Sequence, residues 1–188
     1  MLEKLPHAVG RALRTVRPGL EKVACARKEL IRAPYSIVVT SPAFGDFETI
    51  PMTFTADGTG TSPPIEWSNV PMATRSLALI VEDADSPTPQ PLVHAIAWSI
   101  GPEIRAIPDG ALAGRSDTAL LGQNSFLRPI WLPPDPPPGH GMHRYAFQVF
   151  ALDAPLQLAV HPGRRAVMQA MRGHVLARGL LIGTYERP

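Results

Sequence analysis

The sequence predicts a mainly β protein that carries an N-terminal helical arm. Apolar runs of strand length follow one another from residue 35 onward, with turn signals between them. No helix-like segment separates these runs until about residue 164, and strands that succeed each other without helices usually pair antiparallel. The 22 prolines, six of them within residues 129–138, indicate rigid loops on a β scaffold, since proline cannot donate to a central ladder.

The first 33 residues have a different pattern. Apolar side chains recur there at steps of three and four, which is typical of an amphipathic helix, at Leu2, Leu5, Val9, Leu13 and Val16. Pro18 interrupts this stripe and suits the first turn of a second helix, whose looser stripe continues to Ile31. We therefore expect two short helices in an arm of residues 1–33, followed by a domain of residues 34–188.

Within the domain, the turn signals divide the chain into short strands. Towards the C-terminus, residues 164–178 show helical periodicity, with Gly179 as the expected stop, and a last strand is expected at 180–185. The arginines of this helix, Arg164, Arg165 and Arg172, fit its solvent-facing side. The expected strands before it are residues 37–40, 50–55, 65–68, 77–82, 93–100 and 144–152.

Charge and composition exclude several classes of function. The arm has a net charge of +5 and the remaining domain −3, so the domain lacks the basic stripe that nucleic-acid binding needs. A single cysteine, Cys25, excludes an intrachain disulfide and fits a reducing compartment. No apolar run is long enough to span a membrane, and the N-terminus lacks the apolar core of a secretion signal. We expect a cytoplasmic protein.

The basic arm has three possible roles. It can pack on its own domain, exchange with the arm of a second copy, or lie on an anionic membrane. Because its predicted helices contain neither Trp nor Phe, they are weak membrane anchors, and we expect no stable insertion. Packing on the domain or a homodimer through the arm is favoured.

Polar residues at the ends of apolar strands form the candidate site. Asp83 and Asp85 follow the strand at 77–82, and His143 and Tyr145 open the strand at 144–152. Side chains alternate along a strand, so His143 and Tyr145 project to one side. If the two strand ends meet, the aspartate, the histidine and the tyrosine lie together.

The strand at residues 93–100 adds a second histidine to this prediction. Simple alternation places His94 on the same face as Ile96 and Trp98. Pro87, Pro89 and Pro91 would stiffen the connection from the aspartates to His94. We expect His94 to converge with the other polar groups.

These segments resemble the phosphatidylethanolamine-binding protein family, which includes Raf kinase inhibitor proteins, plant flowering regulators and bacterial members. The likeness lies in Asp83-x-Asp85-x-Pro87 followed by His94, and in Pro136-Pro137-x-Gly139-x-Gly141-x-His143-Arg144-Tyr145. Residues 62–67, 124–126 and 145–153 continue it. The resemblance covers roughly residues 37–187 and leaves out the arm.

The resemblance implies a large antiparallel sheet packed on a smaller one, with peripheral helices. It also implies a site at one end of the sheet for phosphate or a phospholipid head group. The residues implied as ligand-binding are Asp83, Pro87, His94, His143 and Tyr145. Modulation of a protein kinase or another signalling partner is a role that the resemblance allows.

The chain departs from the family pattern in front of the second motif. Where members carry a glycine-rich loop around an aromatic residue, residues 127–134 are bulky or proline, although Trp131 keeps the aromatic. Asp135 stands where glycine or cysteine is usual and would add negative charge near an anion. Trp131 and Asp135 are therefore added to the ligand-binding candidates, and a cationic or neutral ligand becomes an alternative.

Other interpretations of the same residues stay open. Asp83 and Asp85 could cap turns and pair with Arg144. The spacing of His140 and His143 suggests a metal, but the segment is a glycine-rich loop and no metal site or cofactor is expected. Asp83 and His143 could act as acid and base in a hydrolase-like enzyme. Because no nucleophile or phosphate-loop motif is present, non-catalytic binding is the favoured function.

Overall fold

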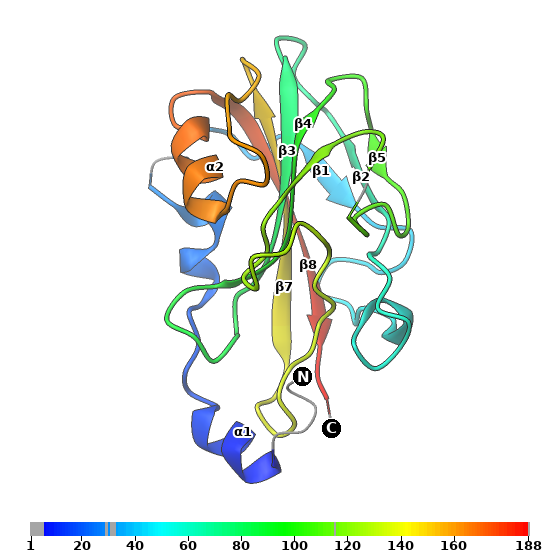
Figure 1. The fold of residues 1–188 in the computed structure, drawn as a ribbon, viewed down its shortest axis with the longest axis vertical. Helices are drawn as coiled ribbons and strands as arrows, with labels where there is room; N and C mark the ends of the chain where they lie inside the picture. Colours follow the sequence, from blue (N-terminus) through cyan, green and yellow to red (C-terminus); the bar gives the residue numbers. More distant parts are fainter. Residues whose placement is uncertain (1–5, 29, 31–32, 115, 188) are drawn as a thin grey trace.

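A computed structural model describes residues 6–28, 30, 33–114 and 116–187. It confirms a mainly β architecture of two antiparallel sheets (Figure 1). The large sheet has the order β6-β4-β3-β7-β8 and the small sheet the order β1-β2-β5. The strands are β1 (Val38–Thr40), β2 (Ile65–Ser68), β3 (Ser76–Asp83), β4 (Leu92–Ile100), β5 (Ala106–Ile107), β6 (Leu120–Gly122), β7 (His143–Leu152) and β8 (Val175–Tyr185).

The large sheet is covered on both faces, which explains why its central strands are almost continuously apolar. Every residue of β3 is buried. One face packs against the small sheet around Trp67 and Phe147, and the other packs against the arm and helix α2 (Arg164–Met171). A strand that is buried on both sides has no solvent-exposed face, so its sequence does not alternate between polar and apolar residues.

Two predicted elements are wrong in extent or type. Residues 50–55 form a short 3-10 turn, η4 (Met52–Phe54), instead of a strand. The helix expected at 164–178 ends at Met171, and the chain turns at Gly173, which has φ of 79°. Gly179 lies inside β8, where an added Cβ would come within 2.5 Å of the Ile37 carbonyl oxygen. It provides close packing instead of a helix stop.

The arm contains one helix, α1 (His7–Leu13), and two 3-10 turns, η2 (Leu20–Lys22) and η3 (Ala24–Ala26). The predicted second helix is therefore wrong. Its backbone donors are used elsewhere, because Ala24 N–H donates to Glu82 and Cys25 N–H donates to Gln148. The predicted apolar positions Leu2, Leu5 and Ile31 lie outside the described residues.

The arm packs along its own domain. Val23, Ala24, Cys25 and Leu30 are buried in the cluster under the large sheet. From there the chain runs to α1, which lies at the end of the molecule where β7 begins (Figure 1). Among the described residues, no helix is long and apolar enough to cross a membrane. A homodimer through the arm stays a prediction.

Candidate ligand-binding site

Pairing of β3 with β7 brings the two predicted strand ends together. Asp83 is opposite Tyr145 in the register, so the end of β3 lies beside the start of β7. Asp83, His94, His143 and Tyr145 are all at most 3% exposed. Their contacts, described below, show that they form one cluster instead of facing separate regions of solvent.

A chain of hydrogen bonds joins Asp83 to the arm. His143 Nδ1 lies 2.7 Å from Asp83 Oδ2, and His143 Nε2 lies 2.7 Å from His140 Nδ1. His140 Nε2 lies 2.9 Å from the carbonyl oxygen of Leu13, to which it must donate. Each link uses one hydrogen, and a neutral imidazole donates one hydrogen bond and accepts another.

Burial and the neighbouring His143 charge lower the pKa of His140, which keeps that ring neutral. Because the neutral ring donates from Nε2 to the Leu13 carbonyl oxygen, its Nδ1 accepts from His143 Nε2. The other ring nitrogen of His143 is held by the Asp83 carboxylate at 2.7 Å. Both ring nitrogens of His143 are thus engaged, so a ligand must replace His140 before it can accept a hydrogen bond from His143.

A β-bulge directs His94 into this cluster. The register between β3 and β4 passes from Val81–Ala95 to Glu82–Val93, which leaves His94 as an extra residue. The prediction that His94 shares a face with Ile96 and Trp98 is wrong, because those two side chains pack on the opposite face of the sheet. The His94 ring lies instead 5.1 Å from the ring of Tyr145. Bulges often re-aim a side chain at a functional site in this way.

Three rings in this cluster carry buried polar atoms that have no hydrogen-bond partner among the described residues. These atoms are His94 Nε2, Trp131 Nε1 and Tyr145 Oη. The His94 ring is 6.0 Å from that of Trp131, so the three rings are neighbours. Unpaired buried polar atoms cost free energy and need an explanation. Half of the six such side-chain atoms in the described chain lie here.

The protonation of two of these groups is fixed by burial. His94 Nδ1 lies 2.6 Å from the Leu132 carbonyl oxygen and must donate to it. Burial lowers the pKa of His94, so the neutral ring presents a lone pair at Nε2. Burial and the charge of Asp83 raise the pKa of Tyr145 well above its usual value, so Oη keeps its hydrogen. The cluster therefore offers an acceptor at His94 and donors at Tyr145 and Trp131.

Asp85 has a structural role at the edge of the cluster. Its carboxylate accepts two hydrogen bonds of 2.7 Å from the Arg144 guanidinium and lies 3.2 Å from Arg17 of the arm. Burial alone would raise the pKa of Asp85, but the hydrogen bonds and charges of Arg144 and Arg17 lower it overall. The alternative that an aspartate here pairs with Arg144 is correct for Asp85, whereas Asp83 pairs with His143.

The negative charge of Asp135 is partly compensated within the protein. Arg187 Nη1 donates to it at 2.6 Å, and the same guanidinium donates to Asp57. Because one positive charge is shared by two carboxylates, this pairing weakens the argument for a cationic ligand without removing it. Pro87 is half-buried in the loop between β3 and β4, and its part in ligand binding stays a prediction.

Sequence reasoning missed three residues that shape the cluster. His140 was weighed only as a metal ligand, and Arg17 and Arg187 were not considered. The glycines on either side of His140 were the available signal: both have positive φ, and they turn the loop so that the ring reaches His143. Nothing in the local sequence marks Arg17 or Arg187, since their partners lie more than 50 residues away.

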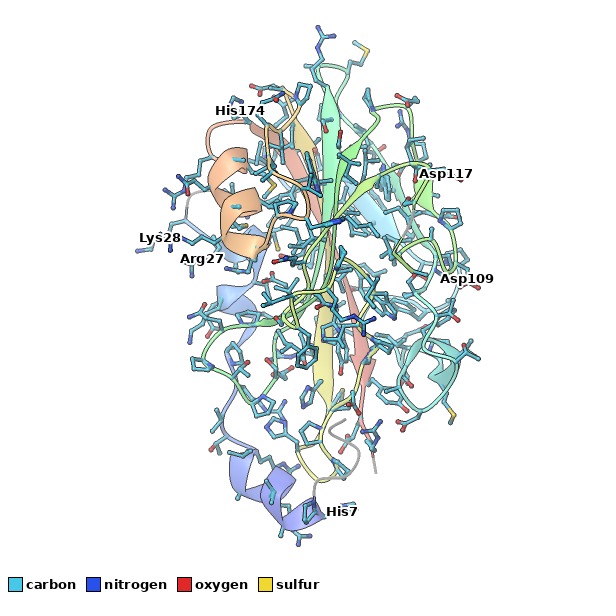
Figure 2. The ribbon with its side chains drawn as sticks, in the orientation of Figure 1. His7, Arg27, Lys28, Asp109, Asp117 and His174 are labelled. Atoms are coloured by element: carbon cyan, nitrogen blue, oxygen red, sulfur yellow. The ribbon has the colours of Figure 1, made fainter. Side chains whose placement is uncertain are left out.

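A separate cavity of about 440 Å³ lies between the arm and α2, lined by Arg27, Arg164, Arg165, Met168, Gln169 and Arg172. Figure 2 shows Arg27 and Lys28 beside this helix, on the side of the molecule away from His7. The prediction that Arg164 faces solvent is wrong, because it donates to the buried carboxylate of Glu82. This cavity contains none of the predicted ligand-binding residues. The unpartnered buried atoms make the cluster around His94 the stronger candidate site.

No group of three or more metal-ligating side chains in the described part of the chain has an arrangement that could hold a metal ion. The Asp83, His143 and His140 side chains instead hydrogen-bond to one another. Their nitrogen and oxygen atoms are occupied by these bonds.

The chain is thus a mainly β protein of two antiparallel sheets, with a buried Asp83–His143 pair where β3 ends and β7 begins. The model of the phosphatidylethanolamine-binding protein family matches residues 40–186. The chain belongs to this family.

Similar proteins come from archaea and bacteria. A UPF0098 protein of Pyrococcus horikoshii is 39% identical over 151 residues, which cover 78% of this chain and 75% of that protein. A UPF0098 protein of Mycobacterium bovis is 34% identical, and the match covers 92% of this chain and 83% of that protein. The second match therefore extends into the arm.

Two crystal structures are similar in fold and sequence. A phosphatidylethanolamine-binding protein homologue from Chlamydia trachomatis has a TM-score of 0.75 and 34% identity. Escherichia coli YbcL, described as a member of the mammalian family, has a TM-score of 0.76 and 25% identity. Each match covers 81% of this chain and 99% of the compared chain.

Proposed function

We propose that the protein binds a small phosphate-bearing anion, free or as a phosphorylated head group, without catalysing a reaction. The observation that carries the proposal is the set of buried atoms on His94, Trp131 and Tyr145 that lack a hydrogen-bond partner within the described part of the chain. A ligand that supplies their partners recovers the free energy lost by leaving them unpaired. The Asp83–His143 pair beside them would complete the binding site.

Phosphate chemistry matches the donors and acceptors of this cluster. A monoprotonated phosphate has one hydroxyl, which can donate to His94 Nε2, and oxygens that can accept from Tyr145 and Trp131. A fully ionised carboxylate has no hydrogen for His94, and in a phosphodiester head group the ethanolamine ammonium would have to supply it. The names of the similar proteins, which refer to phosphatidylethanolamine, agree with a phosphorylated ligand. Pairing of Asp135 with Arg187 reduces repulsion of an anion.

The direct test is a titration with inorganic phosphate and with phosphoethanolamine, followed by NMR of the histidine and tryptophan side chains. Tyr145→Phe removes one donor and keeps the ring, and we expect affinity to fall about tenfold. His143→Ala is expected to abolish binding. Trp98→Phe is the matched control, because Trp98 Nε1 is also buried without a partner in the described chain but lies on the other face of the sheet. Equal phosphate affinity in His143→Ala and the unmodified protein would refute the assignment.

An acid–base enzyme is the second candidate, and the short Asp83–His143–His140 chain favours it. An imidazole held by a carboxylate can move a proton to or from a substrate. Assays on phosphate monoesters and carboxylic esters separate the two functions. Turnover that disappears in Asp83→Asn would establish the enzyme and displace the binding proposal. Binding of phosphate without turnover would support the binding proposal.

We further propose that the protein acts in the cytoplasm, where its ligand or a signalling partner such as a protein kinase would be met. The single buried cysteine suits a reducing compartment. Family resemblance alone suggests the kinase, and no residue of this chain identifies it. An assay of kinase activity with increasing amounts of the protein tests this partner, with Asp83→Asn as the comparison.

A further inference from the structure

The arm covers the candidate site through several contacts with the loops that border it. Arg17 donates to the carbonyl oxygens of His140 (2.6 Å) and Met142 (2.7 Å) and lies 3.2 Å from the Asp85 carboxylate. Two residues further on, Gly19 N–H donates to the carbonyl oxygen of Ala84. The arm thus ties the loop after β3 to the loop before β7, and these loops adjoin Asp83 at the end of β3 and His143 at the start of β7.

The helix α1 packs against the same loop with little space between them. A Cβ added to Gly10 would lie 2.0 Å from the carbonyl oxygen of Pro138, and one added to Gly139 would lie 2.9 Å from that of His7. Gly10 is buried although its neighbours in α1 are exposed. The helix is therefore fitted to the loop that holds His140, and this contact involves backbone on both sides.

His140 occupies the place of a ligand. Its Nδ1 accepts the hydrogen of His143 Nε2, which a phosphate oxygen would otherwise accept. Its Nε2 is held by the carbonyl oxygen of Leu13, and its own carbonyl oxygen is held by Arg17. His140 is completely buried, so the ring shields His143 from solvent.

We infer that residues 13–17 of the arm hold His140 on His143, so that the site is closed by an internal ligand and admits a lipid-attached phosphate only after the arm is released. This inference rests on the proposed function. A small phosphate has only to displace the imidazole. A head group on a glycerolipid also needs room for its chains, and the segment around Arg17 borders the site where they would have to leave.

Release of the arm is expected to leave the fold intact. Asp85 keeps its two hydrogen bonds from Arg144 when Arg17 is removed, so no buried carboxylate is left unpaired. The buried part of the arm around Ala24 and Cys25 is anchored separately by Glu82 and Gln148. Arg17→Ala should therefore loosen residues 13–17 and His140 while the sheet stays folded.

The first experiment compares full-length protein with Arg17→Ala, His140→Ala and the control Arg14→Ala. Arg14 is an exposed arginine of the same segment, and its loss changes the charge equally. We expect phosphate affinity to rise roughly tenfold in Arg17→Ala and His140→Ala, because the apparent affinity is reduced by the closed fraction. Dihexanoyl phosphatidylethanolamine should bind Arg17→Ala only, because in His140→Ala the contacts of Arg17 with Met142 and Asp85 still hold the arm in place. Equal binding of this short-chain lipid by the unmodified protein would overturn the inference.

The second experiment needs no ligand. Diethyl pyrocarbonate modifies accessible imidazoles, and mass spectrometry of the peptide that contains His140 and His143 reports their exposure. Modification should be slow in the unmodified protein and in Arg14→Ala, and several-fold faster in Arg17→Ala, with the exposed His174 as internal reference. Unchanged rates in Arg17→Ala would overturn the inference. Faster modification without phosphate binding in any variant would support closure by the arm and refute the proposed function.

Discussion

Replacement of Arg187 tests whether the C-terminal residues support the site. This guanidinium is 8% exposed and donates to both oxygens of Asp57, to Asp135 at 2.6 Å and to the Pro136 carbonyl oxygen. Arg187→Ala would leave two carboxylates without this partner, one of them beside the ligand-binding cluster. The change therefore affects both stability and anion binding.

The expected loss of stability follows from how far the partners are buried. Breaking a fully buried pair costs about 3–5 kcal/mol. The side chains of Asp57 and Asp135 are 29% and 16% exposed, so part of their hydration is retained. We expect the free energy of unfolding to fall by about 2–3 kcal/mol, which corresponds to a decrease in Tm of roughly 4–12 °C for a chain of this length.

Urea unfolding followed by tryptophan fluorescence measures this change. Arg105→Ala is the control, because Arg105 is exposed and donates only to nearby backbone carbonyls, so its loss should cost under about 0.5 kcal/mol. A loss below 1 kcal/mol in Arg187→Ala would refute the reasoning.

Hydrogen bonding by Arg187 lowers the pKa of Asp57, so this stabilisation is present above pH 3.8 and disappears as pH falls below it. The decrease in the free energy of unfolding on acidification should therefore be smaller in Arg187→Ala than in the unmodified protein.

Two further predictions concern the histidines and the packing of β8. Burial lowers the pKa of His94 and His140 below 6.5, so their contribution to stability is complete above pH 6.5 and is lost as pH falls. The urea midpoint should decrease between pH 7.5 and pH 5.5, and a constant midpoint would contradict this assignment. Gly179→Ala places a methyl group against the Ile37 carbonyl and should cost about 1–3 kcal/mol in urea unfolding. The control Gly163→Ala meets no atom within 4 Å and loses only the N-cap preference for glycine at α2, so it should cost no more than about 1 kcal/mol; similar losses in both variants would rule out the steric explanation.

Strand prediction succeeded where the chain carries its own signals. The apolar runs at 65–68, 77–82 and 144–152 correspond to β2, β3 and β7 within two residues. The prediction failed at residues 50–55, where an apolar, β-branched stretch forms the 3-10 turn η4. It also failed at residues 175–179, where helical periodicity continued into β8, because the pairing of β8 with β7 outweighs local preference.

The candidate site could be predicted in part. Asp83, His143 and Tyr145 follow from strand alternation and antiparallel register, and these residues do converge. His94 also lies in the cluster, although the reason given for its direction was wrong. A bulge reverses the alternation, and no local pattern distinguishes a bulged residue from its neighbours.

The sequence by itself determined the β class of the protein, the order of its main strands and the polar groups at their ends. These features depend on local periodicity and on turn residues, which each segment carries. Only the tertiary structure decided that His140 covers His143, that Arg17 holds this loop and that Arg187 pairs with Asp135. Such contacts join residues far apart in the chain, and their geometry is set by packing of the whole sheet, so no single segment encodes them.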